Sequence, residues 1–199
     1  INAACAGFVY GLDLANLYLQ HGYRRILLIS AEQLSRITDF TDRSTCVLFG
    51  DGAGAVVLEG DDSPFVSALG ADGDGVNALF ARKPDNSNPF LKEQRTLSEA
   101  DGFPEGKPGM IRMAGQAVYK FAVTAMPAAV RKACEKANLA PEALDWIIPH
   151  QANLRIIQTA ISALKLPEEK FICNIGESAN ISSACIPVAL DQAVRDGRI

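Results

Sequence analysis

Short apolar segments alternate with long helical segments along most of this chain of 199 residues. The predicted strands are residues 25–30, 56–58, 65–69, 145–148 and 171–173, and the predicted helices are residues 5–21, 112–137, 153–165 and 182–195. Strands separated by helices of this size predict parallel β-α-β units and a layered α/β domain. Because residues 25–30 are apolar without alternation, we expect a sheet that is covered on both faces.

Composition narrows the classes of function. A formal net charge of −4 and a pI near 5.2 disfavour nucleic acid or an anionic membrane as a partner bound by bulk attraction. No apolar run approaches the roughly 18 residues that span a bilayer. Five scattered cysteines without a Cys-x-x-Cys pair are typical of a reducing cytoplasm and not of a disulfide framework. Residues 71–109 are rich in Gly, Pro, Asp and Asn and predict a functional surface loop.

Cys5 lies where a short apolar segment meets the first predicted helix. Unpaired N–H groups at a helix start favour the thiolate, so we expect this position to lower the pKa of the thiol. Small neighbours, Ala3, Ala4, Ala6 and Gly7, leave room for a substrate. An inert buried cysteine is the alternative, because free cysteines are often buried.

His150 and Asn180 occupy two similar corners. His150 ends the strand-like segment before the helix at 153–165, and Asn180 lies in a small, polar turn before the last helix. Functional side chains gather where strands end in α/β sheets. Taken singly, the histidine could be structural and the asparagine a helix cap. With only His21 and His150 in the chain and no ligand spacing around either, we expect no zinc site.

Gly50, Gly52 and Gly54 superficially match a dinucleotide-binding fingerprint. That fingerprint needs a helix after the glycines, whose N-terminus holds the pyrophosphate. Here the glycines lead into the apolar segment 56–58, which predicts a strand. We therefore expect a tight bend with close backbone packing and no nucleotide site.

Four segments in order, residues 2–8, 49–55, 149–153 and 180–184, carry the resemblance to a known family. Together they resemble β-ketoacyl-[acyl-carrier-protein] synthase III, the initiating condensing enzyme of type II fatty-acid synthesis. The resemblance implies a thiolase-like layered αβαβα architecture, incomplete at both ends. Residues 1–60 would be the end of an N-terminal half with the nucleophile helix, and residues 61–199 most of a C-terminal half. We therefore expect that these 199 residues alone do not form a stable, active enzyme.

The same resemblance implies a chemistry for the corners. Cys5 would take an acyl group from acyl-CoA, and His150 and Asn180 would stabilise the malonyl thioester during decarboxylative condensation with malonyl-acyl carrier protein. Acyl-CoA would be a substrate, with no cofactor and no metal. The family resemblance also places Arg43 and Asn153 on CoA, and Arg155 and Lys120 where the acidic carrier protein docks. A homodimer in the cytoplasm is implied for the full-length protein.

Some residues of this chain depart from the family pattern, and two alternatives to the condensing function remain. Ser178-Ala179 and Ile181 replace the residues that usually flank the asparagine, which affects the shape of the pocket. The first alternative is a related Cys-His-Asn acyltransferase of polyketide or secondary metabolism, or one that passes the acyl group to an alcohol, an amine or water. The second is a non-catalytic binding protein with the same fold. Acyl-chain preference cannot be read from residues 71–109.

Overall fold

A computed structural model describes residues 1–81, 107 and 109–199. The helices and strands are α1 (Gly7–Gln20), β1 (Arg25–Gln33), β2 (Asp51–Glu59), β3 (Leu79–Ala81), β4 (Ile111–Met113), α2 (Gly115–Ala137), α3 (Leu154–Leu164), α4 (Ile175–Ser178) and α5 (Cys185–Arg195). Short 3-10 turns are η1 (Ala4–Ala6), η2 (Leu34–Ile37), η3 (Gly73–Gly75), η5 (Pro141–Ala143), η6 (Glu168–Lys170) and η7 (Ser182–Ala184). Most of the predicted loop at 71–109 lies outside the described residues.

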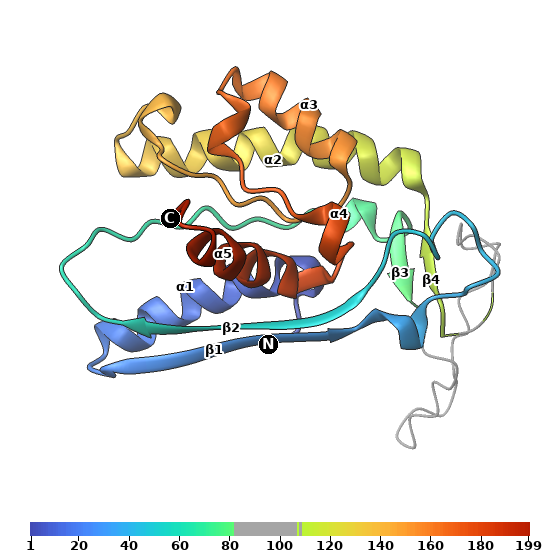
Figure 1. The fold of residues 1–199 in the computed structure, drawn as a ribbon, viewed down its shortest axis with the longest axis horizontal. Coiled ribbons are helices and arrows are strands. Elements are labelled where there is room, and N and C mark those ends of the chain that lie inside the picture. The colour runs from blue at the N-terminus through green and yellow to red at the C-terminus, as the bar shows by residue number, and fades with distance from the viewer. Residues whose placement is uncertain (82–106, 108) are drawn as a thin grey trace.

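β1 and β2 form a long antiparallel pair, with Arg25 opposite Glu59 and Gln33 opposite Asp51. The prediction of parallel pairing is wrong here, because the connection between the strands holds no helix long enough for a crossover. α1 and α5 cover the same face of this pair (Figure 1). On the other face Leu27 and Ile29 are 60% and 58% exposed, so the described structure covers one face only.

A second, short extended pair flanks α3. Ile147 and Phe171 form a parallel bridge, in which the Ile147 N–H donates to the Lys170 carbonyl at 2.8 Å and the Ile172 N–H to the Ile147 carbonyl at 2.9 Å. Two strand-like segments joined by a helix make a parallel β-α-β unit. The predicted parallel arrangement is therefore present here, although each segment is reduced to a single bridge.

The core places this extended pair between two layers of helices. Phe171 packs with Leu164 and Leu166 on the side of α2 and α3. Its neighbour Ile172 packs with Ala189 and Ala193 of α5. Successive residues of an extended chain face opposite sides, so one segment serves both layers. Figure 1 shows the resulting order, from β1 and β2 through α1 and α5 to α2 and α3.

The predicted helices are present, with ends set by specific residues. Asn138 ends α2 in the left-handed conformation, with φ of 54°. Asn153 caps α3, where its side chain accepts a hydrogen bond from the Arg155 N–H at 2.9 Å. Pro187 lies in the first turn of α5, where its missing N–H leaves no helical hydrogen bond unmade.

The predicted strand at residues 65–69 is wrong. This segment runs across α1 and α2 and is held by side chains instead of a neighbouring strand. The Ser67 hydroxyl donates to Asp13, and Lys136 Nζ donates to the Ser67 carbonyl at 2.7 Å. The Tyr10 hydroxyl donates to the Gly70 carbonyl at 3.1 Å. Because side chains donate to these backbone carbonyls, the apolar segment forms no strand.

Two kinds of feature are missing from the described part of the chain. None of its helices is both long enough and apolar enough to cross a membrane. It also contains no cluster of three or more His, Cys, Asp or Glu side chains that could hold a metal ion.

Candidate active site

Cys5 lies in η1, the single turn that leads into α1, and its side chain is half-buried. The preceding Ala4 has a φ of 44°, in the left-handed region that few non-glycine residues adopt. η1 packs against η7, the turn that follows Asn180. The fold thus brings the first and last predicted corners together from opposite ends of the sequence.

The pKa of the Cys5 thiol is raised above its ordinary value of 9.0, chiefly because the thiol is buried. The Ser182 side chain and a backbone N–H hydrogen-bond to the sulfur and oppose this rise, whereas the negative Glu32 adds to it. The expectation that the helix start lowers this pKa is therefore wrong. Burial disfavours the thiolate by more than the local hydrogen bonds favour it, so the thiol is protonated at neutral pH.

His150 ends the extended segment at Pro149 and lies just before α3. Burial lowers the pKa of its imidazole from 6.5 to about 4, and a hydrogen bond with the backbone of Ser182 partly opposes this. The ring is therefore neutral at physiological pH. Within the described residues its buried Nδ1 has no hydrogen-bond partner. Buried polar atoms are normally paired, so a bound substrate or a thiol could satisfy this nitrogen.

Asn180 is 7% exposed and its backbone is fixed by the segment before β2. Its N–H donates to the Leu48 carbonyl at 2.9 Å, and its carbonyl accepts from the Gly50 N–H at 3.0 Å. The side-chain Oδ1 accepts a hydrogen bond from the Ser182 N–H at 3.0 Å. Since this contact identifies the oxygen end of the amide, the opposite NH₂ group is the end that can donate to a ligand.

The turn that packs against η1 contains Ser182, which the sequence did not single out. The Ser182 N–H donates to Asn180 Oδ1 at 3.0 Å, its side chain acts to lower the pKa of the Cys5 thiol, and its backbone acts to raise the pKa of the His150 imidazole. A serine in a small-residue turn carries no distinctive signal. The site also includes Glu32, whose carboxylate accepts from the Ser183 N–H at 3.3 Å and from the Ser183 hydroxyl.

Cys185 is a second buried thiol at this site. Its sulfur accepts from the Ile181 N–H at 3.3 Å and lies 4.0 Å from both Asn180 Oδ1 and the Gln151 carbonyl. Burial raises its pKa, and the neighbouring Cys5 adds to that effect. This thiol has only backbone and amide partners, which suits a packing role between the His150 and Asn180 corners.

The remaining predicted residues lie outside this cluster. Arg43 is exposed on a loop whose flanking Asp42 accepts from the Ser44 N–H and hydroxyl at 2.9 and 2.7 Å. Arg155 and Lys120 are exposed on α3 and α2. Those two helices pack together. The hydroxyls of Tyr119, next to Lys120, and of Thr159, one turn after Arg155, lie 3.0 Å apart and join the helices. Asn153 uses its Oδ1 as the cap of α3.

The glycines at 50–54 pack against the turn and helix that follow Asn180. They lie at the start of β2, and no helix follows them. A Cβ at Gly54 would lie 2.9 Å from Pro187 Cβ and 3.0 Å from the Val188 backbone nitrogen. A Cβ at Gly52 would lie 3.0 Å from Ile181 Cδ1. Close packing is confirmed as their role, within a strand instead of the expected bend.

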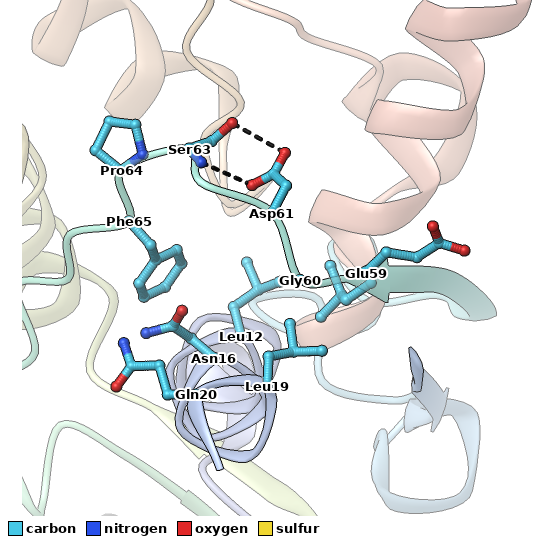
Figure 2. Close-up of a pocket in the computed structure, with 11 residues that line it drawn as sticks. Leu12, Asn16, Leu19, Gln20, Glu59, Gly60, Asp61, Ser63, Pro64 and Phe65 are labelled. Atoms are coloured by element: carbon cyan, nitrogen blue, oxygen red, sulfur yellow. Dashed lines mark hydrogen bonds between the residues drawn. The ribbon is translucent and has the colours of Figure 1, made fainter. Parts of the chain in front are cut away.

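A separate pocket of about 340 Å³ lies at the far end of α1 from Cys5. Figure 2 shows its floor of Leu12 and Leu19, with Phe65 on one side and the hydrogen-bonded turn of Asp61 and Ser63 above. No predicted catalytic or binding residue lines it. The pocket is therefore distinct from the candidate site.

Two family descriptions match the chain. Residues 1–75 match 3-oxoacyl-[acyl-carrier-protein] synthase III, and residues 134–199 match the C-terminal part of the same synthase. β-Ketoacyl-[acyl-carrier-protein] synthase III of Synechocystis sp. is 45% identical over the whole chain. The chain spans 59% of the length of that relative.

Solved structures show the same similarity. The 3-oxoacyl-[acyl-carrier-protein] synthase III of Aquifex aeolicus is 39% identical with a TM-score of 0.84, over 100% of this chain and 58% of that one. A priming β-ketosynthase from the R1128 polyketide pathway is 32% identical with a TM-score of 0.79, over 100% of this chain and 57% of that one. The predicted α/β, thiolase-like fold class is confirmed by these structures.

Proposed function

Because the chain belongs to the 3-oxoacyl-[acyl-carrier-protein] synthase III family, we propose that the protein containing it is a condensing acyltransferase. It would transfer an acyl group from acyl-CoA to Cys5 and then condense that group with malonyl-acyl carrier protein. The observation that carries this proposal is that η1, which holds Cys5, packs against the turn that follows Asn180, while Cys185 Sγ lies 4.0 Å from both Asn180 Oδ1 and the carbonyl of Gln151, the residue after His150. A nucleophile, a neutral imidazole and an amide donor in one place suit acyl transfer.

In the first half-reaction, the Cys5 sulfur attacks the thioester carbonyl of acyl-CoA, and the bond from that carbonyl to the CoA sulfur breaks. The thiol is protonated at neutral pH, so its proton must leave as the new thioester forms. The neutral His150 can accept this proton and pass it to the departing CoA thiolate. The products are acyl-Cys5 and free CoA, and His150 returns to its neutral form.

In the second half-reaction, the malonyl group loses CO₂ and its carbanion attacks the carbonyl of acyl-Cys5. Negative charge develops on the malonyl thioester oxygen as the C–C bond to CO₂ breaks. The NH₂ group of Asn180 and the imidazole N–H of His150 would stabilise that oxygen by hydrogen bonds. The carbanion forms the new C–C bond and expels the Cys5 thiolate, which takes up a proton. The product is 3-oxoacyl-acyl carrier protein.

Binding roles and assembly follow from the same family membership. Arg43 and Asn153 would contact CoA, and the exposed Arg155 and Lys120 would attract an acidic carrier protein. Acyl-CoA would act as a substrate, with no further cofactor. We also propose a homodimer. We further propose a location in the cytoplasm, which the five free cysteines support.

Residues 1–60 and 61–199 would belong to the N- and C-terminal halves of the fold. The order of the two family matches, 1–75 and then 134–199, supports an N-terminal part followed by a C-terminal part, and the first match extends past residue 60.

A second candidate function is the priming of a polyketide or another secondary metabolite. The similarity to the R1128 priming β-ketosynthase favours it as an alternative. The chemistry at Cys5 would be the same, and the two functions would differ in the acyl-CoA and carrier protein that are used. A panel of short, branched and aromatic acyl-CoAs, tested against fatty-acid and polyketide carrier proteins, separates them.

The test of the proposal is condensation by the full-length gene product that contains this chain. We expect acyl-CoA and malonyl-acyl carrier protein together to give CO₂ and a 3-oxoacyl-carrier product, and Cys5→Ala to give no 3-oxoacyl product. If CoA is released without malonate and no C–C bond forms, the protein is an acyltransferase to another acceptor or a hydrolase. If Cys5 is not acylated by any acyl-CoA, the proposal is wrong and a binding role gains support.

A further inference from the structure

We propose that Arg112 is a positioning residue that ties the Arg43 loop, residues 38–50, to β4. This inference rests on the proposed function, in which Arg43 would contact CoA. Arg112 would not contact CoA itself. It would hold the loop in the conformation from which Arg43 reaches that substrate.

Two aspartates shape the Arg43 loop from within. The Asp39 carboxylate accepts hydrogen bonds from the N–H and the hydroxyl of Thr41, at 3.0 and 2.6 Å. The Asp42 carboxylate accepts from the N–H and the hydroxyl of Ser44, at 2.9 and 2.7 Å. Contacts of this kind form local turns. Arg43 lies inside the second turn, so the position of the Asp42 carboxylate decides how the backbone presents Arg43.

Arg112 lies between these two carboxylates. Its Nη2 lies 3.9 Å from Asp39 Oδ2, and its Nη1 lies 3.8 Å from Asp42 Oδ2. The Arg112 side chain is only 11% exposed. Its buried Nε has no hydrogen-bond partner within the described residues, so the two carboxylates balance the charge of this guanidinium. Because an unpaired buried charge is costly, each side of this contact depends on the other.

The backbone of Arg112 belongs to regular structure. Arg112 is the middle residue of β4, lies opposite Phe80 of β3, and is followed by α2 after only two further residues. The Arg43 loop, which the structure describes throughout, contains no helix or strand. Figure 1 shows the segment between β1 and β2 beside β3 and β4. A loop keeps its position through contacts with such a rigid scaffold, so Arg112 is well placed to fix this one.

Lys107 gives the loop a second cation. Its Nζ donates to Asp39 Oδ1 and to Thr41 Oγ1, both at 2.8 Å. The Lys107 side chain is 57% exposed, and exposed ion pairs contribute little. Asp42, in contrast, has Arg112 as its only cationic partner in the described part of the chain. Loss of Arg112 should therefore release the turn that carries Arg43, even while Lys107 still holds Asp39.

The expected effect on catalysis is specific. A loop that samples several conformations presents Arg43 correctly for only part of the time, and the apparent affinity for CoA falls by that fraction. Cys5, His150 and Asn180 lie on other segments of the chain. The loss should therefore appear in KM for acyl-CoA and leave kcat nearly unchanged.

The test compares Arg112→Met, Arg43→Met and the double variant in the full-length gene product. Arg195→Met is the matched control, because Arg195 also pairs with an aspartate, at 2.7 Å, but on the exposed side of α5. Arg112→Lys keeps the buried positive charge and therefore folds even if Arg112→Met does not. Its single ammonium cannot pair with two carboxylates as the planar guanidinium does, so its effect should be intermediate.

The first readout is KM for acyl-CoA in the condensation assay. We expect Arg112→Met to raise this KM roughly 10-fold with little change in kcat, and Arg195→Met to match the wild type. Because Arg112 acts through Arg43, the double variant should have the same KM as Arg43→Met alone. The second readout is hydrogen–deuterium exchange of residues 38–50, measured by mass spectrometry. Exchange should be roughly 10-fold faster in Arg112→Met than in the wild type.

The outcomes separate this inference from the proposed function. If the wild type condenses and Arg112→Met leaves KM unchanged, or raises it equally with and without Arg43, only this inference is wrong. If Arg112→Met does not fold, unchanged KM and exchange in Arg112→Lys overturn the inference instead. If the wild type does not condense, the proposed function is wrong and exchange alone tests Arg112. Unchanged exchange then overturns its positioning role, and faster exchange supports it.

Discussion

The side-chain oxygen of Gln151 accepts a hydrogen bond from the backbone N–H of Asn174 at 3.0 Å. The same side chain donates from its Nε2 to the carbonyls of Pro149 and Ile172 at 2.9 and 3.2 Å. Gln151 is fully buried, so each of these backbone groups depends on it in place of water. One amide thus joins the corner that carries His150 to the segment that leads to Asn180.

We therefore predict that Gln151→Leu lowers the free energy of unfolding by about 2–4 kcal/mol, because it leaves buried backbone groups without partners. Urea unfolding of the full-length gene product measures this loss. Gln158→Leu on the exposed side of α3 is the control and should change stability by less than about 0.5 kcal/mol. Equal stability of the two variants would show that water replaces the amide.

His150 makes stability depend on pH in a defined window. Its pKa is about 4 in the folded protein and about 6.5 when unfolded, so the unfolded state binds more protons between these values. Stability should therefore be complete above pH 6.5 and fall as the pH drops towards 4, by about 3 kcal/mol from this residue.

Unfolding midpoints between pH 4 and 7 measure that slope, and His150→Gln should flatten it. His21→Gln is the control, because it removes the other histidine at the exposed end of α1. An unchanged slope in His150→Gln would mean that the imidazole is not buried in its neutral form.

Glu32 should control the reactivity of Cys5. Its negative charge contributes to the raised pKa of the thiol, so Glu32→Gln should lower that pKa and move the pH profile of Cys5 alkylation by iodoacetamide to lower pH. The glutamine oxygen can still accept from Ser183, which preserves the turn. Glu59→Gln, at the exposed end of β2, is the control. A shift to higher pH, or none, would contradict this role for the carboxylate.

Gly54 should tolerate no side chain, because a Cβ there would lie 2.9 Å from Pro187 and 3.0 Å from a backbone nitrogen. We expect Gly54→Ala to destabilise the protein by about 1–3 kcal/mol through overpacking. Thermal unfolding measures this loss of stability. Gly73→Ala is the control, because no atom lies within 4 Å of the added Cβ. If Gly54→Ala is as stable as the control, close packing does not explain this glycine.

Helices were predictable from the sequence because their signals are local. The predicted helices at 112–137 and 153–165 match α2 and α3 to within three residues at each end, and Asn138 and Asn153 are caps of these helices in the structure. The arrangement of the strands could not be predicted, because it depends on residues far apart in the sequence. Whether residues 25–30 are covered on one face or two depends on β2 and the helices that pack on the strand pair. Residues 65–69 failed for the same reason, since α1 and α2 supply their partners.

The candidate site also contains residues that could be predicted from local sequence and residues that could not. The corners at Cys5, His150 and Asn180 could be predicted because each lies at a recognisable junction of a motif. Glu32 could not, because its partner Ser183 is 151 residues away in the chain. The direction of the Cys5 pKa shift was also missed, since it follows from burial and not from the position at a helix start.

The most direct test of the account is the mass of the Cys5 peptide after wild type and Asn180→Asp are incubated with acyl-CoA and then with malonyl-acyl carrier protein. Aspartate can still accept from the Ser182 N–H but lacks the NH₂ donor. We predict an acyl group on Cys5 in both proteins, which malonyl-acyl carrier protein removes from the wild type and removes about 10²–10³ times more slowly from Asn180→Asp. An acyl group on another residue, on none, or lost equally fast from both proteins would contradict the account.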